Sequence, residues 1–331
     1  MFEHQAQNRV SHTRSTSSAT PADDYCGPVR VLEPDDWQAR ATAHDARLAP
    51  FLDAHLARRT HRTKHPVHDF LFVYYSQKPG ALRKWHPGFG TGMAQAEAYA
   101  SLKGYEVVDG VAHVPASYVE SQQVLLTALR RLLRATLDRA PHFGCFGLHE
   151  WAMVYRLEQD KTRHAAWPLR LGGAATDEVV ESHRIACSHF DAYRFFTPPA
   201  KPLNTLDPGQ DDRPEFEQPG CLHASMDLYK HAFRLSPMIS SDLVADCFEL
   251  ARDIRILDMR AAPYDLTGLW LDDEEFTPVR IETPEGKAEY VAAQRDYTER
   301  SAPLRARLLA EVERLLEVAA PTLVSTSRSS A

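Results

Sequence analysis

The chain has 331 residues, of which 44% are hydrophobic and 25% charged, and its formal net charge is −7. This composition is typical of a folded globular protein, and the acidic balance argues against a protein whose main task is to grip nucleic-acid phosphates. Its five cysteines include no CxxC pair, which argues against a disulfide scaffold or zinc ribbon and favours a reducing, cytoplasmic location. No run of 18 apolar residues occurs, so we expect a soluble protein without a membrane span.

The two ends of the chain differ from the rest in composition. Residues 1–30 are rich in Ser, Thr, Asp and Pro, and residues 319–331 end in the polar run STSRSSA, so both are predicted to be disordered tails. Between them we expect one globular, mostly helical domain over residues 31–318. The polar loop 203–220 is longer than most connections and is the candidate internal boundary.

Apolar residues recur at helical spacing in most of the chain. Ser117 with Glu120 three residues later forms a capping-box pattern at the start of one helix. A serine N-cap is expected before Leu243, and Thr283 with Pro284 marks the start of the last helix. Pro303 should break or kink that helix. The predicted helical segments are, in chain order, residues 35–59, 117–139, 221–237, 240–261 and 283–317.

Strand patterns are fewer than helix patterns. The apolar and aromatic run DFLFVYYS (residues 69–76) and the segment AYRFFT (residues 192–197) are expected to be strands. The segment YEVVDGVAHVP (residues 105–115) is typical of a hairpin around Asp109-Gly110. The fold class predicted is mainly α (α+β with a minor β element), with a multi-helix globular core.

One short segment, CLHASMDLYKHAFRLSP, spaces His223, Asp227 and His231 four residues apart. On a helix these three side chains project along one face. Imidazole and carboxylate are good ligands for zinc, iron or manganese, so the spacing favours a ligand face. The alternative is a polar helix face on which Asp227 pairs with Lys230 or Arg234.

Two other segments could supply partners for that face. In ESHRIACSHFDAYRFF, His183, His189 and Asp191 occur together, and the last two are spaced to share one face of an extended strand. In GCFGLHEWAMVYR, His149 and Glu150 stand inside an apolar run. A buried ionisable pair is costly unless it is paired or functional, whereas the alternative is a solvent-facing turn.

These residues predict the His/carboxylate centre of a metal-dependent enzyme that acts on a small molecule, either by hydrolysis through a metal-activated water or by oxygen activation through non-haem iron. A non-catalytic helical binding protein with structural histidines stays open. The predicted acid/base residues are Glu150, Asp227 and His149. The predicted ligands of a divalent Fe, Mn or Zn ion are His223, Asp227, His231, His183, His189 and Asp191.

Several phrases together carry a family resemblance over about residues 30–318: HDFLFVYYS, WHPGFG, FGCFGLHEWAMVYR, HFDAYRFFTPPAKPLN, GCLHASMDLYKHAFRLSP, DIRILDMRAAPYDL and IETPEGKAEYV. They resemble a group of actinobacterial proteins labelled 3-methyladenine DNA glycosylase. The resemblance implies a hydrolase of DNA repair that excises an alkylated nucleobase, with DNA as partner, although the net charge does not favour DNA binding. The chain lacks a helix-hairpin-helix motif, and no catalytic residue is carried over.

Overall fold

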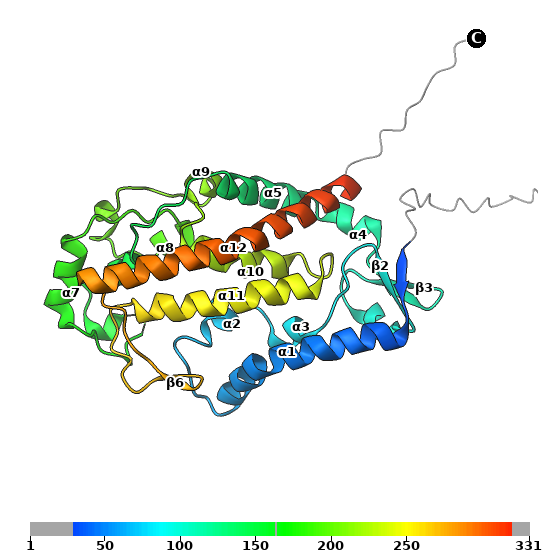
Figure 1. Ribbon diagram of the computed structural model, residues 1–331, viewed down its shortest axis with the longest axis horizontal. Helices are drawn as coiled ribbons and strands as arrows, with labels where there is room; N and C mark the ends of the chain where they lie inside the picture. Colours follow the sequence, from blue (N-terminus) through cyan, green and yellow to red (C-terminus); the bar gives the residue numbers. More distant parts are fainter. Residues whose placement is uncertain (1–28, 163, 320–331) are drawn as a thin grey trace, which may run out of the picture.

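The computed structural model describes residues 29–162 and 164–319, so nearly all of both predicted tails lies outside the described residues. The architecture is mainly helical with a minor β component, as the sequence predicted. Three helices run side by side along the long axis, with a small sheet at one end of the molecule (Figure 1). The five longest helices are α1 (Pro34–Thr60), α5 (Gln123–Leu137), α10 (Leu222–Arg234), α11 (Ser241–Arg260) and α12 (Pro284–Ala319).

Helix α12 starts where the sequence predicted but passes the proline that was expected to interrupt it. Thr283 Oγ1 accepts a hydrogen bond from the backbone N–H of Gly286 at 3.1 Å, which fixes the first turn. The helix then continues through Pro303, so the predicted break is wrong. Pro303 and Glu299, whose carbonyl loses its intrahelical partner, are both exposed.

The predicted caps had different outcomes. Ser240 Oγ accepts from the backbone N–H of Asp242 at 3.1 Å, so the serine cap of α11 is confirmed. The capping box is wrong, because Ser117 lies inside the short helix α4 (Ala116–Ser121) and its side chain forms no cap. Gln122 separates α4 from α5, so the predicted helix is two helices.

The main sheet has the order β1-β2-β4-β3, in which β1 and β2 are parallel and the other pairs are antiparallel. Asp109 (φ 50°) and Gly110 (φ 79°) both lie in the left-handed region, as a tight two-residue hairpin turn requires, so the predicted hairpin is confirmed. The strands are β1 (Arg30–Leu32), β2 (Thr91–Ala94), β3 (Glu106–Val108), β4 (Val111–His113), and a separate hairpin of β5 (Trp270–Leu271) and β6 (Glu274–Glu275).

Two predicted strands are helices instead. Residues 69–76 contain α2 (Phe70–Tyr74), and residues 192–197 follow from α8 (Phe190–Tyr193) into turns. Aromatic runs have high β propensity, but burial decides their structure. In α2 the adjacent residues Leu71 and Phe72 are both buried while Val73 is 71% exposed, a pattern that a strand of alternating faces does not give.

The main core lies between α10, α11, α12 and the short helix α6, where Trp151, Tyr229 and Phe248 are fully buried. The candidate boundary loop 203–220 contains one short helix, α9. Within the described residues, no helix is both long and apolar enough to cross a membrane. The remaining helices are α3 (Pro79–Arg83), α6 (Leu148–Ala152), α7 (Gly172–Glu181), α9 (Arg213–Phe216) and the 3₁₀ turns Glu97–Ser101, Gln159–Lys161 and Lys201–Leu203.

Candidate metal centre

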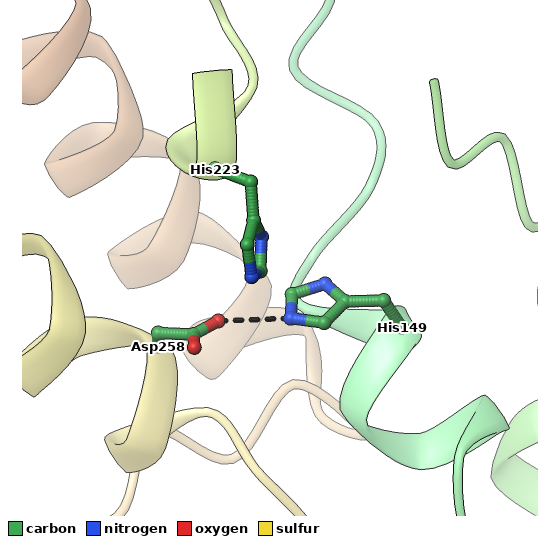
Figure 2. A group of neighbouring side chains, drawn as sticks. All are labelled: His149, His223 and Asp258. Carbon is green, nitrogen blue, oxygen red and sulfur yellow. Dashed lines mark ion pairs between the residues drawn. The ribbon is translucent and has the colours of Figure 1, made fainter. Parts of the chain in front are cut away.

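Three buried side chains from distant parts of the chain meet at one point: His149, His223 and Asp258 (Figure 2). His149 comes from α6, His223 from the first turn of α10 and Asp258 from the last turn of α11. Gly147 turns the chain into α6 with φ 70°, and a Cβ on it would lie 3.3 Å from the Cβ of Ala261. The glycine therefore allows α6 to approach the end of α11 closely.

The ligand atoms of these three residues all lie within 4.8 Å of one another. His149 Nε2 and Asp258 Oδ1 are 3.0 Å apart, but they are not aligned for a hydrogen bond, and neither has a hydrogen-bond partner among the described residues. Two ligands of one metal ion, each about 2.1 Å from it, lie about 3 to 3.5 Å apart. The two buried atoms form an ion pair while His149 keeps its proton (Figure 2), and their separation is also that of two ligands of one metal ion that replaces this proton.

The protonation states also suit metal binding. Burial, reinforced by His149, lowers the pKa of His223 to about 3, so at neutral pH His223 offers a lone pair. Burial alone would raise the pKa of the Asp258 carboxyl, but His149 and Arg255 outweigh it and hold that pKa well below its usual range. Burial would lower the pKa of His149, and the Asp258 carboxylate reverses this and raises it. A metal ion would replace the His149 proton.

Arg255 holds the carboxylate in place from the side away from His149. Its Nη1 donates to Asp258 Oδ2, and also to Glu150 Oε1 at 3.0 Å. All three groups are almost fully buried, so the two negative charges share one fixed positive charge. Asp258 therefore presents Oδ1 to the histidines while Oδ2 is occupied, which is how a second-layer contact orients a metal ligand.

A small cavity of about 10 Å³ adjoins His149 and His223. This is space for about one water molecule. Three thiols also line it, Cys145, Cys187 and Cys221. Burial raises the pKa of all three, that of Cys187 to about 12, so the thiols are protonated and neutral at pH 7. The thiols therefore add no ligand at neutral pH, and the ligand set is His223, Asp258 and His149, which gives up its proton when it binds a metal ion.

Asp227, which the sequence analysis placed at the heart of the site, accepts hydrogen bonds at both of its carboxylate oxygens. Tyr75 Oη donates to Oδ1 at 2.7 Å, while Arg213 Nη2 at 2.8 Å and Lys230 Nζ at 3.2 Å donate to Oδ2. Burial would raise the pKa of Asp227, but His189 and the cations outweigh it and hold the pKa well below its usual range. The structure therefore places Asp227 in an ion-pair cluster, together with Asp191, Glu217, Arg213 and Lys230.

The other predicted ligands are not gathered at one point. His189 lies between the two clusters, with its Nε2 3.4 Å from Asp227 Oδ2 and its ring centroid 5.4 Å from that of His223. His231 is buried against the ion-pair cluster and its Nδ1 has no partner among the described residues. His183 is at the end of α7, where its Nδ1 lies 2.6 Å from the carbonyl oxygen of Val179. His189 is the N-cap of α8, so the predicted strand face shared with Asp191 is wrong.

The structure thus brings together His149 and His223 from the predicted residues, and it adds Asp258 and Arg255, which sequence reasoning did not assign to a centre. Glu150 reaches the centre through Arg255, and the alternative of a solvent-facing turn is wrong because Glu150 and His149 are both 5% exposed. One signal for Asp258 was present in the sequence. It follows Ile254 and Ala251 at helical spacing, so an acid falls on the apolar face of α11.

Comparisons with known proteins add no relative: no family model matches the chain, and no curated protein or solved structure matches it. The glycosylase resemblance and the base excision that it implies stay predictions.

Proposed function

We propose that the protein is a metal-dependent hydrolase whose His149, His223 and Asp258 side chains hold one divalent ion, zinc fitting best. The observation that carries this proposal is the convergence of three buried ligand atoms, with His149 Nε2 and Asp258 Oδ1 3.0 Å apart beside His223 and no aligned hydrogen bond between them. Two histidines and a carboxylate form a ligand set of catalytic zinc sites, which leave a fourth position for water.

When bound, zinc lowers the pKa of its water towards neutrality and so supplies a nucleophile for hydrolysis. The chain's own residues do the rest. Arg255 fixes Asp258 through its Oδ2, and the Asp258 carboxylate faces His149. The small cavity beside His223 holds one water-sized molecule, and the surrounding apolar and thiol groups limit access of bulk water.

Metal binding by the full-length protein tests this proposal. The protein is stripped with a chelator, dialysed and titrated with zinc by isothermal titration calorimetry. We expect one zinc per chain in the wild type, and a zinc affinity lower by roughly 100-fold or more in His223→Ala. Mutating a residue that only hydrogen-bonds a metal ligand commonly lowers metal affinity by about 10- to 100-fold, and loss of a ligand itself should cost at least as much. His223 makes no hydrogen bond with a described residue, so its removal leaves no unpaired group.

His231→Asn is the matched control, because His231 is an equally buried histidine of the same helix that lies outside the centre. Equal zinc affinity in His223→Ala and the wild type would contradict the proposed site. Hydrolysis of p-nitrophenyl acetate by the zinc-loaded proteins tests the activity, which should depend on zinc and fall in His223→Ala but not in His231→Asn.

The same ligand set also suits non-haem iron, since two histidines and a carboxylate on one face of iron are common in oxygen-activating enzymes. Elemental analysis of protein purified under anaerobic conditions separates the two candidates. Iron rather than zinc, with oxygen consumption, would replace hydrolysis by oxygen activation at the same residues.

Base excision is tested in the same preparations. Release of methylated adenine from alkylated duplex DNA that is unaffected by a chelator but lost in Glu150→Gln would favour the activity implied by the resemblance. Zinc-dependent ester cleavage without such release would favour the metal-dependent hydrolase.

A further inference from the structure

A second cavity, of about 1070 Å³, lies away from the candidate metal centre. It opens between the end of α1, the loop that follows, α2, and the turn at residues 164–167. Its volume is that of sites for small organic ligands, which commonly measure about 300 to 1000 Å³. It shares no lining residue with the small cavity beside His149 and His223.

The lining of this cavity carries a surplus of positive charge. Arg59, Arg62, Lys64 and Lys78 line it, and none of them forms an ion pair with a described residue. Among the described lining residues Asp69 is the one acid, and Arg58 and His55 occupy its Oδ1. The four cations are therefore available to an anion from solution.

Asp69 also holds the cation-bearing loop in place. Its Oδ2 accepts from the backbone N–H of His65 at 2.8 Å, while Oδ1 accepts from Arg58 Nη2 at 2.7 Å. Burial would raise the pKa of Asp69, but Arg58, His55 and the His65 amide outweigh it and lower that pKa. The carboxylate is therefore ionised at neutral pH, and it anchors the loop that carries Arg62 and Lys64 to the end of α1.

Two buried polar side chains on the cavity wall have unused hydrogen-bonding capacity. Gln77 is 8% exposed, and its side-chain amide forms no hydrogen bond with a described residue. His55 Nδ1 lies 2.8 Å from Asp69 Oδ1, so the ionised Asp69 assigns the His55 proton to Nδ1. No described residue bonds to His55 Nε2. The polar ends of Gln77 and His55 reach solvent at the cavity, so both can bond a polar ligand there.

Aromatic residues give the same cavity an apolar wall. Phe70 and Tyr74 are stacked with ring centroids 4.8 Å apart and an interplanar angle of 10°, and Trp167 lines the cavity from the turn at residues 164–167. Aromatic faces favour planar rings, which they bind by offset or edge contacts. A ligand that uses both the cations and this wall has a flat ring at one end and an anion at the other.

The backbone at the rim is also unusual. Arg62 and Ser76 both line the cavity and both have φ 55°. This is the left-handed backbone region, which residues other than Gly and Asn rarely adopt. Such conformations are strained and concentrate where a site must be shaped. They fix the direction in which the chain leaves α1 on one side and α2 on the other.

We propose that this cavity binds a small phosphorylated molecule with a planar ring, of the class of a nucleoside monophosphate. The phosphate lies among Arg59, Arg62, Lys64 and Lys78. A phosphate carries about −1.5 to −2 charges at pH 7, which suits a group of cations better than a single carboxylate would. The ring lies against the aromatic wall, and Gln77 and His55 Nε2 bond the polar atoms of the ligand.

One contact joins this cavity to the candidate metal centre. The Arg255 guanidinium lies over the Phe70 ring, with its Cζ 3.9 Å from the ring centroid. Phe70 lines the cavity, and Arg255 holds Asp258. The binding proposal is independent of the metal proposal, since it uses none of the metal-binding residues.

Calorimetric titration of the full-length protein with adenosine 5′-monophosphate, adenosine and inorganic phosphate tests the proposal. We expect the monophosphate to bind with an affinity at least about tenfold higher than either fragment alone, because it reaches both halves of the cavity. The affinity should fall with rising salt, because the cations are exposed. Inorganic phosphate that binds as tightly as the monophosphate would overturn the role of the ring.

Variants locate the binding. Removal of two cavity cations in Arg59→Ala/Lys64→Ala should weaken monophosphate binding by about tenfold, which corresponds to about 0.7 kcal/mol for each cation. The matched control, Lys103→Ala/Arg130→Ala, removes two exposed cations that lie outside this cavity and form no ion pair with a described residue, and it should bind as the wild type does. Equal weakening in both double variants would reduce the effect to overall charge and overturn the site.

Trp167→Leu provides a second, independent variant. It should weaken the monophosphate severalfold and leave inorganic phosphate unchanged. No binding of the monophosphate at millimolar concentration would overturn the proposal. So would binding of a single-stranded oligonucleotide without binding of the monophosphate, because the ligand would then be a strand rather than a small molecule.

Discussion

Two neighbouring clusters along α10 both contain imidazole and carboxylate groups, but they differ in how these groups are hydrogen-bonded. At His223, one turn into the helix, imidazole and carboxylate atoms face one another without aligned hydrogen bonds. At Asp227, one turn later, each carboxylate oxygen accepts from at least one donor. Spacing on a helix brings residues to one face, but the partners supplied by other elements decide whether they can bind anything further.

The difference follows from the charges that reach each cluster. Asp227 meets Arg213 from α9 and Lys230 from its own helix, so its charge is neutralised within the protein. Asp258 meets one arginine, Arg255, which it shares with Glu150. Asp258 is thus held by Arg255 and by His149, whose proton a metal ion could replace, whereas Asp227 is already paired with two fixed cations.

Asp227→Asn should show the largest effect on stability. It removes the central charge of a buried cluster and leaves Arg213 and Lys230 less compensated, so we expect a loss of about 3 kcal/mol in the free energy of unfolding at pH 7. Urea unfolding measures it, and zinc stoichiometry should not change. Glu215→Gln, which breaks the exposed pair with Arg131, should cost less than about 1 kcal/mol and serves as control. A loss as small in Asp227→Asn would remove the contrast between the clusters.

His231→Asn should change the pH dependence of stability. Burial lowers the pKa of His231 to about 3, with Arg213 and Lys230 opposing the attraction of Asp227. Between pH 6.5 and 3 the unfolded chain binds a proton at this residue that the folded protein does not, so stability falls as the pH falls through that window. The contribution is up to about 1.4 kcal/mol per pH unit.

Unfolding curves at pH 7, 6 and 5 test this, with the metal-free protein used throughout. The wild type should lose stability more steeply than His231→Asn below about pH 6.5, the pKa of an unfolded histidine. Parallel slopes would show that His231 accepts a proton in the folded state.

Tyr75→Phe should have the smallest effect of the three. It removes the hydrogen bond from Tyr75 Oη to Asp227 Oδ1, 2.7 Å long, and we expect a loss of about 1.5 kcal/mol, as for other hydrogen bonds to charged groups. Tyr193→Phe is the matched control, since its hydroxyl bonds the exposed Asp207 at 2.9 Å and should contribute less. Thermal unfolding compares the two, and a larger loss in Tyr193→Phe would argue that Asp227 does not depend on its donors.

Where a residue pattern has one structural solution, the sequence predicted the structure well. The serine cap at α11, the start of α12 at Thr283 and the Asp109-Gly110 turn were all found as expected. The aromatic runs at residues 69–76 and 192–197 were predicted as strands, but the first contains α2 and the second passes from the end of α8 into turns, because contacts with distant core residues outweigh a local β propensity.

The chain by itself determined the helical class, the main helix starts and the presence of histidines and acids in apolar surroundings, since these depend on local periodicity and caps. Which of them meet was decided only by the tertiary structure. His149, His223 and Asp258 are separated by tens of residues and converge where α6, α10 and α11 pack together. Asp227, only four residues from His223, is instead neutralised by Lys230, a partner that the helical spacing offered, and by Arg213, which no local pattern could pair with it, because burial and charge compensation depend on the whole fold.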